Sequence, residues 1–199
     1  MLKVGLTGSI AVGKSFVLGI LSELGCRVLD ADATAREVVA PGSAGLQSVV
    51  DTFGNQVLRE DGTLDRTTLA EIVFSNHEKR QLLNSLLHPL IIAAQDDQIR
   101  KWQCEDPRGI AVIDAALMIE SGGYKRFDKL IVVHCRDEVQ LERLMTRDGL
   151  SREQAAQRIA AQMPQAEKKQ LADYLIDTSN GFEAARARTT EVYQALRES

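Results

Sequence analysis

The chain has 199 residues, of which 44% are hydrophobic and 26% are charged. This length is sufficient for one substantial core with small attached subdomains, but it is short for two independent domains. The formal net charge is −4, whereas a nucleic-acid partner held by bulk charge would require a basic face. We therefore expect an ordinary soluble protein with no nucleic-acid partner.

The chain contains three cysteines, Cys26, Cys104 and Cys135. Their number is odd and no C-x-x-C occurs, so neither a disulfide framework nor a cysteine metal site is predicted. The apolar start of the chain is interrupted by glycine and hydroxyl residues from position 5 onward, which argues against a signal peptide or a membrane span. These features favour a cytoplasmic protein with reduced thiols and no membrane association.

Strand and helix patterns begin to alternate at the N-terminus. An apolar run predicts a strand over residues 2–7, and helical spacing predicts a helix over 14–24, with Gly25 as its C′ residue. A short strand is predicted over 27–30, and a helix over 31–39 follows it. This order is typical of α/β architecture with a mainly parallel sheet.

Residues 43–107 have a different pattern, with several helical segments and few strand-like runs. One helix is predicted over 67–74 and another over 78–87. Pro89 then stands where a new helix can begin, because its missing N–H costs nothing at the first helical position, and this helix would run to about residue 102. We interpret the block as a helical insertion in the α/β core.

The α/β pattern resumes after the insertion. The remaining predicted elements are strands over 109–114, 129–135 and 174–177 and helices over 137–148, 151–163 and 181–197. Ser151 with Gln154 forms an S-x-x-Q capping box at the start of one of these helices. The five strands together predict a five-stranded, mainly parallel sheet in a three-layer fold.

A phosphate-binding loop is the strongest motif. Residues 8–15 read G-S-I-A-V-G-K-S, which matches G-x-x-x-x-G-K-S at Gly8, Gly13, Lys14 and Ser15. Glycines let backbone N–H groups surround the phosphates, Lys14 would reach the β- and γ-phosphates, and the Ser15 hydroxyl would bind Mg²⁺. A chance match at a Gly-rich turn is the alternative, but the loop stands between a strand and a helix, as the motif requires.

The loop alone does not separate kinases from GTPases or ATPases. A guanine-recognition motif of the N-K-x-D type is absent from the sequence, and so is a long motor-type domain. The size of the chain fits a small-molecule kinase.

Three carboxylates follow predicted strands, at the sheet edge where α/β proteins place their sites. Asp30 and Asp32 end the second strand and start its helix. Either can simply cap that helix, but Asp30 as the cap leaves Asp32 to orient or deprotonate an acceptor hydroxyl. Asp114 ends the third strand, where an acidic residue commonly holds Mg²⁺ through water; a plain loop-start carboxylate is the alternative.

Two arginines and one histidine are further candidates. Arg143 and Arg147 are four residues apart on one predicted helix face, where they can clamp phosphates or can be solvated surface charges. His88 precedes Pro89, and a lone histidine beside a helix start is usually structural or a cap.

With these residues assembled, the chain resembles the dephospho-coenzyme A kinase family over nearly its whole length. The resemblance is carried by V-G-L-T-G-S-I-A-V-G-K-S (4–15), L-G-C-R-V-L-D-A-D (24–32), A-R-E-V-V-A-P-G (35–42), F-G (53–54), D-G-T-L-D-R (61–66), L-L-H-P-L-I (86–91), D-A-A-L-M-I-E-S-G (114–122), Q-L-E-R-L-M-T-R-D (140–148), R-I-x-x-Q (158–162) and A-D-Y-L-I-D (172–177). The loop motif is generic, whereas the D-A-D, H-P-L-I and R-I-x-x-Q runs in this order are more specific.

The resemblance implies a P-loop fold with three parts. These are a nucleotide-binding core at 1–34 with 106–136 and 172–199, a helical domain for the CoA substrate at 35–105, and a lid at 137–171. It implies transfer of the γ-phosphate of ATP to the 3′-hydroxyl of the dephospho-CoA ribose, with ATP and Mg²⁺ as cofactors. No partners other than these small molecules are implied, and a monomer or weak homo-oligomer is expected.

The resemblance also implies roles for individual residues. The catalytic residues would be Asp32 as base, Lys14, and Arg143 as a lid arginine at the phosphates. The residues expected to bind ATP are Gly8, Ala11, Val12, Gly13, Lys14, Ser15, Phe16 and Arg147. The acceptor would be bound by Asp32, His88, Pro89 and Asp114, and Mg²⁺ by Ser15 and, through water, Asp114.

The loop departs from the usual family pattern G-x-G-S-G-K-S-T. Ala11, Val12 and Phe16 replace Gly, Ser and Thr. The first two still offer backbone N–H groups, so phosphate binding depends on whether the local φ and ψ angles suit residues other than glycine. A kinase for another small acceptor on the same scaffold, or a regulatory nucleotide-binding protein without catalysis, are the alternative functions.

Overall fold

The computed structural model describes residues 1–74 and 76–198. The described chain forms two compact units, residues 1–29 with 102–199 and residues 30–101, and each is presented by itself. The predicted division into core, substrate domain and lid stays a prediction.

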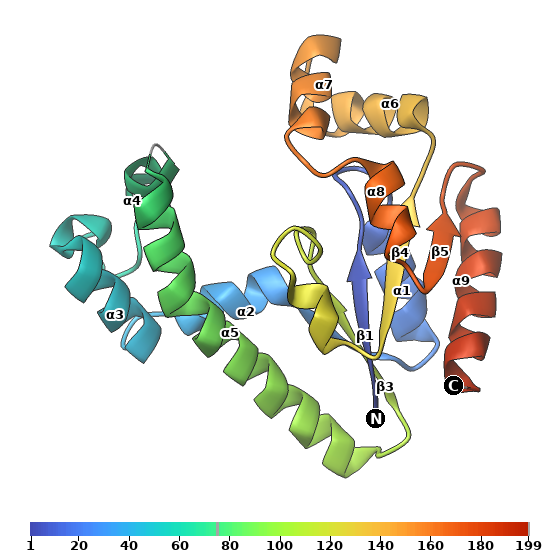
Figure 1. The fold of residues 1–199 in the computed structure, drawn as a ribbon, viewed down its shortest axis with the longest axis horizontal. Helices are drawn as coiled ribbons and strands as arrows, with labels where there is room; N and C mark the ends of the chain where they lie inside the picture. The colour runs from blue at the N-terminus through green and yellow to red at the C-terminus, as the bar shows by residue number, and fades with distance from the viewer. Residues whose placement is uncertain (75, 199) are drawn as a thin grey trace. The chain divides into compact units, whose positions relative to one another are not determined.

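The first unit is built on a five-stranded sheet with the order β2-β3-β1-β4-β5 (Figure 1). The strands are β1 Leu2–Thr7, β2 Arg27–Asp30, β3 Ile110–Asp114, β4 Lys129–His134 and β5 Tyr174–Asp177. β1 pairs in parallel with β3 and with β4, and β4 pairs in parallel with β5. The predicted α/β fold with a five-stranded sheet is therefore confirmed.

The central strands are apolar on both faces because a parallel sheet is covered by helices on both sides. Val4 and Leu6 of β1, Val112 of β3 and Ile131 of β4 have no exposed surface. They form one cluster with residues of the flanking helices. Burial of these strands fixes the register, and the register places the carboxyl ends of β1, β3, β4 and β5 along one edge.

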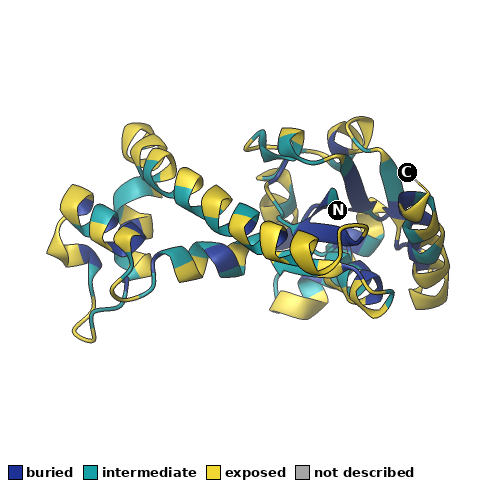
Figure 2. Ribbon diagram, turned by 90° about the horizontal axis from the view of Figure 1, so that it is seen from below, coloured by how far each residue is buried: buried dark blue, intermediate teal, exposed yellow. Residues whose placement is uncertain are grey.

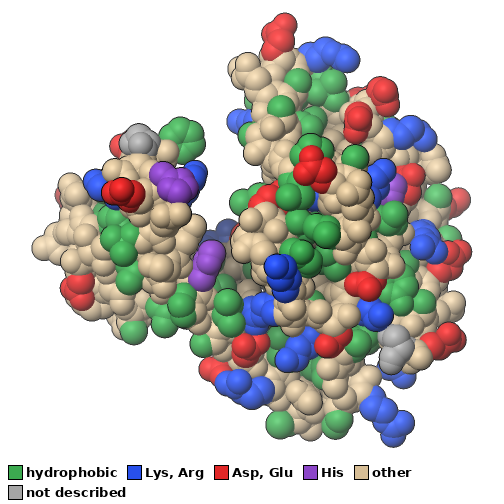
Figure 3. Space-filling model, viewed as in Figure 1, with side chains coloured by type: hydrophobic (Ala, Val, Ile, Leu, Met, Phe, Trp, Pro, Cys, Tyr) green, Lys and Arg blue, Asp and Glu red, His purple; other side chains and the backbone are tan. Residues whose placement is uncertain are grey.

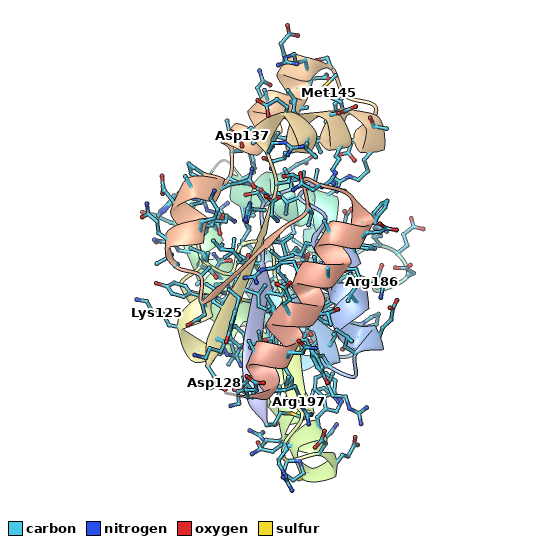
Figure 4. All side chains as sticks on the ribbon, turned by 90° about the vertical axis from the view of Figure 1, so that its right-hand side faces the viewer. Lys125, Asp128, Asp137, Met145, Arg186 and Arg197 are labelled. Carbon is cyan, nitrogen blue, oxygen red and sulfur yellow. The ribbon has the colours of Figure 1, made fainter. Side chains whose placement is uncertain are left out.

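The helices of this unit are α1 Lys14–Glu23, η2 Gly123–Arg126, α6 Asp137–Asp148, α7 Arg152–Ala160, α8 Gln165–Gln170 and α9 Phe182–Arg197, together with the C-terminal part of α5. α9 packs on α1 and β5, α8 packs on β4, and α6 packs on α7. Figure 4 shows Arg186 on α9, and its guanidinium donates to Glu23 of α1 at 2.8 Å.

Local signals placed several helix ends correctly. Gly25 follows α1 with a φ of 96°, a conformation that favours glycine, as its predicted C′ role requires. The Ser151–Gln154 capping box is present at the start of α7. The prediction of one helix over 151–163 is wrong at its end, because α7 stops at Ala160 and the short α8 begins after Pro164. A residue that precedes proline is disfavoured in helical conformation, so the chain turns there.

The second unit is helical, as predicted for the insertion. Its elements are α2 Ala31–Val38, α3 Ala44–Phe53, η1 Asn55–Val57, α4 Arg66–Phe74 and the first part of α5 His77–Glu105. α3 was not predicted individually, although Ser43 caps it and Leu46, Val49 and Phe53 share its buried face. A separate apolar cluster forms between these helices, and Figure 2 shows buried stretches alternating with exposed ones along them.

α5 contradicts the prediction of two helices divided at Pro89. It is one helix of 29 residues with Pro89 inside it. An interior proline removes one hydrogen bond and costs about 3 kcal/mol. Leu83, Leu86 and Leu87, which precede the proline, pack against the apolar cluster of the second unit, and this packing offsets that cost.

Surface and thiol features agree with the composition. Acidic and basic side chains are interspersed on the visible surface (Figure 3). Across residues 1–74 and 76–198, no helix combines the length and apolarity needed to cross a lipid bilayer. All three cysteines are free, Cys26 and Cys135 being buried and Cys104 exposed. Burial raises the pKa of the Cys26 thiol to about 12.

Candidate active site

The phosphate loop connects β1 to α1 at the carboxyl edge of the sheet. Gly8 lies against β4, and a Cβ atom there would be 2.5 Å from the carbonyl oxygen of Val133. Gly13 has a φ of 90° and lies directly before α1. These two positions require glycine, the first for close approach and the second for its backbone angle.

Ala11 has a left-handed backbone conformation of the kind that favours glycine, with a φ of 60°. It is the only described non-glycine residue of the chain with positive φ. For an alanine this conformation costs roughly 1–2 kcal/mol. Val12, another substituted position, is fully buried and does not have a positive φ, so the backbone strain in this part of the loop is confined to Ala11.

A cavity of about 830 Å³ opens over this loop. Its lining comes from the loop with the start of α1, from α6, and from the residues after β5 with the start of α9, together with Ala116 and Gln162. The eight residues predicted to bind ATP all line it: Gly8, Ala11, Val12, Gly13, Lys14, Ser15, Phe16 and Arg147. Arg143 lines it as well. The structure thus gathers these residues in one place, while their binding roles stay predictions.

Lys14 and Asp114 form an ion pair and hydrogen bond at the loop. The two side chains are 18% and 12% exposed. Asp114 ends β3 and is in register with Leu6 of β1, which brings its carboxylate beside the first residue of α1. An acidic residue at the end of a strand is therefore joined directly to the loop lysine.

Arg143 is held against the loop from α6. Its guanidinium donates to Thr178 Oγ1 at 2.9 Å and to the Thr178 carbonyl at 2.8 Å. The Thr178 hydroxyl, which is buried, in turn donates to the Val12 carbonyl at 2.6 Å. These bonds exclude the solvated-surface alternative for Arg143.

Arg147, in contrast to Arg143, is exposed to solvent. Its side chain is 55% exposed and donates to Asp148 at 2.7 Å. Arg158 donates to the same carboxylate at 3.0 Å. The hydrogen bond from Arg147, followed by the charges of both arginines, lowers the pKa of Asp148. Arg147 thus borders the cavity while its guanidinium is paired with Asp148. The alternative of a solvated surface charge therefore describes Arg147 in part.

Two glutamines, to which sequence reasoning gave no role, bond to the loop at Ile10, and a third bonds to one of them. Ile10 N–H donates to Gln162 Oε1 at 2.8 Å, and Gln140 Nε2 donates to the Ile10 carbonyl at 2.7 Å. Gln165 Nε2 donates to Gln140 Oε1 at 2.9 Å. Gln140 is buried, with 1% of its surface exposed. Two of the quoted sequence runs contain these residues, since Q-L-E-R-L-M-T-R-D begins at Gln140 and R-I-x-x-Q ends at Gln162, but neither run identified Ile10 as the partner.

The structure assigns the cap of α2 to Asp30, one of the two carboxylates that the sequence offered for it. The Asp30 carboxylate accepts from the N–H groups of Asp32 and Ala33, at 2.7 and 3.1 Å, and caps α2. Asp32 is exposed on the first turn of α2. The cap role of Asp30 is confirmed, and the role of Asp32 stays a prediction.

His88 and Pro89 are exposed on α5 in the second unit. Neither belongs to the cavity over the phosphate loop. Since Pro89 is inside the helix, His88 does not cap a helix start. Binding of the acceptor by these two residues stays a prediction.

The loop residues fit Mg²⁺ delivered with a nucleotide. Ser15 and Asp114 offer a hydroxyl and a carboxylate, the oxygen donors that Mg²⁺ prefers. Within the described ranges, no group of three or more His, Cys, Asp or Glu side chains is arranged to hold a metal. Phosphate and water would therefore supply most of the ligands, which is the usual manner of Mg²⁺ in phosphoryl-transfer sites.

Comparison with known proteins agrees with this geometry. Residues 2–184 match the family model for dephospho-CoA kinase. The chain belongs to the dephospho-CoA kinase family. A dephospho-CoA kinase from Carboxydothermus hydrogenoformans is 44% identical over 191 residues, covering 96% of this chain and 92% of the relative.

Solved structures give the same result. The dephospho-CoA kinase from Campylobacter jejuni has a TM-score of 0.74 and 31% identity, covering 98% of this chain and 97% of that one. Protein TT1252 from Thermus thermophilus has a TM-score of 0.84 and 29% identity, covering 98% and 96%. The resemblance stated from the motifs is confirmed: the chain is a P-loop kinase of coenzyme A biosynthesis that phosphorylates dephospho-CoA.

Proposed function

We propose that this kinase transfers the γ-phosphoryl group of ATP to the 3′-hydroxyl of the dephospho-CoA ribose. In this proposal residues 8–15 hold the triphosphate of ATP. The observation that carries the proposal is the ion pair between Asp114 and Lys14, which lines the cavity together with Arg143. A cationic side chain beside a strand-end carboxylate is the arrangement that phosphoryl transfer requires.

In this proposal, each residue around the phosphates has a separate task. Lys14 exchanges part of its contact with Asp114 for the β- and γ-phosphates, and Ser15 and Asp114 hold Mg²⁺, the latter through water. When bound, Mg²⁺ neutralises charge on the phosphate oxygens. Arg143 stabilises the charge on the phosphoryl group in transit, and Arg147 contributes from the cavity border.

Asp32 is the proposed base for the acceptor. Its carboxylate orients the ribose 3′-hydroxyl and takes its proton as the new P–O bond forms. The bond between the γ-phosphorus and the bridging oxygen breaks, and that oxygen leaves with ADP. The helical unit, with His88 and Pro89, is proposed to bind the CoA portion. Residues 137–171 are proposed to close as a lid and exclude water, which would otherwise consume ATP.

The same proposal includes the physiological setting. ATP with Mg²⁺ is the phosphoryl donor, and the enzyme works in the cytoplasm as a monomer or weak homo-oligomer on small-molecule substrates.

The test is a coupled assay of ADP release with dephospho-CoA and with a panel of other hydroxyl acceptors, followed by mapping of the phosphorylated hydroxyl. We expect phosphate on the 3′-hydroxyl. Absence of turnover of dephospho-CoA with MgATP would reject the function, and turnover of another acceptor would favour a different small-molecule kinase.

Asp32→Asn separates the base from the rest of the site. We expect kcat to fall by about 10²- to 10⁴-fold, the usual contribution of a general base, with ATP affinity unchanged. Asp30→Asn is the matched control, since asparagine caps a helix as well as aspartate does, and it should keep near-normal turnover. Normal turnover of Asp32→Asn would reject only the role of Asp32.

A further inference from the structure

An exposed phenylalanine borders the cavity over the phosphate loop. Phe182 is the first residue of α9, and 72% of its surface is exposed. Its ring lies 4.8 Å from the ring of Phe16, centroid to centroid, with 58° between the planes. Phe16 follows the loop serine directly, and both phenylalanines line the cavity.

The cavity is therefore lined by two chemically different sets of groups. One set is the backbone N–H groups of the loop with Lys14 and Arg143, which suits phosphate oxygens. The other set is Phe16, Phe182 and Ala185, which carry no charge. A nucleoside triphosphate matches both sets, because it carries phosphates and a flat base on the same molecule.

We propose that Phe16 and Phe182 form an aromatic platform on which the base of the nucleoside triphosphate stacks. The proposal rests on the proposed binding of ATP in this cavity and extends it to the base. Phe182 is available for this contact because most of its ring is uncovered, and Phe16 supports it from α1 at a tilted aromatic contact. Stacking tolerates different bases, since every base has a π face.

The platform predicts how the enzyme selects its donor. A purine covers more of an aromatic ring than a pyrimidine does, so ATP should bind more tightly than CTP. Loss of one stacking partner lowers affinity by about 5- to 100-fold. A triphosphate without a base never reaches the platform, so its affinity should not depend on Phe182.

The test is calorimetric titration of the full-length protein with MgATP, MgCTP and magnesium tripolyphosphate. In Phe182→Ala we expect ATP affinity to fall by about 5- to 100-fold, the ratio of ATP to CTP affinity to approach one, and tripolyphosphate affinity to stay within twofold. Phe182→Tyr should retain ATP affinity. Phe74→Ala is the matched control, because Phe74 is 88% exposed and lies in the helical unit, and it should bind all three probes normally.

Two outcomes would overturn the platform. Unchanged ATP affinity in Phe182→Ala would show that the base does not contact it. An equal loss for ATP and tripolyphosphate would show that Phe182 only supports the loop through Phe16. Both differ from failure of the proposed function, in which the wild-type protein binds ATP on the platform but leaves dephospho-CoA unphosphorylated.

Discussion

Lys168 is the largest fully buried side chain of the protein as described, with 1% of its surface exposed. Its ammonium group lies 2.7 Å from Glu120 Oε1 and donates to the Ala116 carbonyl at 3.2 Å. Both partners belong to the segment that follows Asp114 at the end of β3. We predict that Glu120→Gln, which removes the carboxylate paired with this ammonium group, destabilises the protein by about 2–3 kcal/mol.

The magnitude follows from the burial of the two groups. Loss of one partner of a buried ion pair costs about 3–5 kcal/mol because the remaining charge is uncompensated. Glu120 is 23% exposed, and glutamine keeps one oxygen as an acceptor. We therefore expect the loss of unfolding free energy to lie at or slightly below the lower end of this range. Lys168→Met should cost less, about 1 kcal/mol, because methionine fills the space without a charge and Glu120 can be hydrated.

Urea unfolding at pH 7 measures the free energy of unfolding of both variants, and thermal unfolding gives their Tm as a check. A loss of 2–3 kcal/mol corresponds to a fall in Tm of about 4–12 °C for a chain of this size. Arg186→Met is the matched control, since its pair with Glu23 is 51% and 61% exposed, and exposed pairs contribute less than about 1 kcal/mol. The reasoning is refuted if Glu120→Gln is as stable as Lys168→Met, because the ammonium group would then be adequately solvated.

Two further predictions concern the phosphate loop. Ala11→Gly should raise stability by about 0.5–1 kcal/mol, because relief of the left-handed alanine, roughly 1–2 kcal/mol, exceeds the entropy that glycine adds to the unfolded chain; a lower Tm than that of the wild type would contradict the strain. Thr178→Val keeps the shape of a buried side chain but removes the hydroxyl between Arg143 and the Val12 carbonyl, so we expect a loss of about 1–3 kcal/mol and a fall in kcat of about tenfold, measured by unfolding and steady-state kinetics. Wild-type values for both quantities would show that this hydroxyl does not hold Arg143 in place.

The sequence predicted the elements whose signals are local. All five strands were correctly located, and the signal was clearest for β1, β3 and β4, because a parallel strand buried on both faces is a short continuous apolar run. Asp114 was placed at the loop by the same logic, since the ends of parallel strands share one edge. Gly25 and the Ser151–Gln154 box were readable because capping depends on residues within one turn.

Features that depend on distant contacts were not predictable in the same way. The bond between Ile10 and Gln162 joins residues 152 apart in sequence, and no local pattern identifies such a partner. The continuity of α5 through Pro89 depends on packing of neighbouring leucines, whereas propensity alone predicts a break. Arg143 and Arg147 looked equivalent in sequence, but only Arg143 meets Thr178.

The unassigned contacts share one physical effect on the loop. Gln162 and Gln140 occupy the N–H and carbonyl groups of Ile10, and Thr178 occupies the carbonyl of Val12. These bonds come from α6, from the residues after α7 and from the residues after β5, and they hold the loop backbone in place. A loop held in this way loses less conformational entropy when a triphosphate binds, and its dipoles need no reorganisation during transfer. This restraint also explains how Ala11 keeps a left-handed conformation, because surrounding bonds that determine the loop shape hold a residue that would otherwise relax.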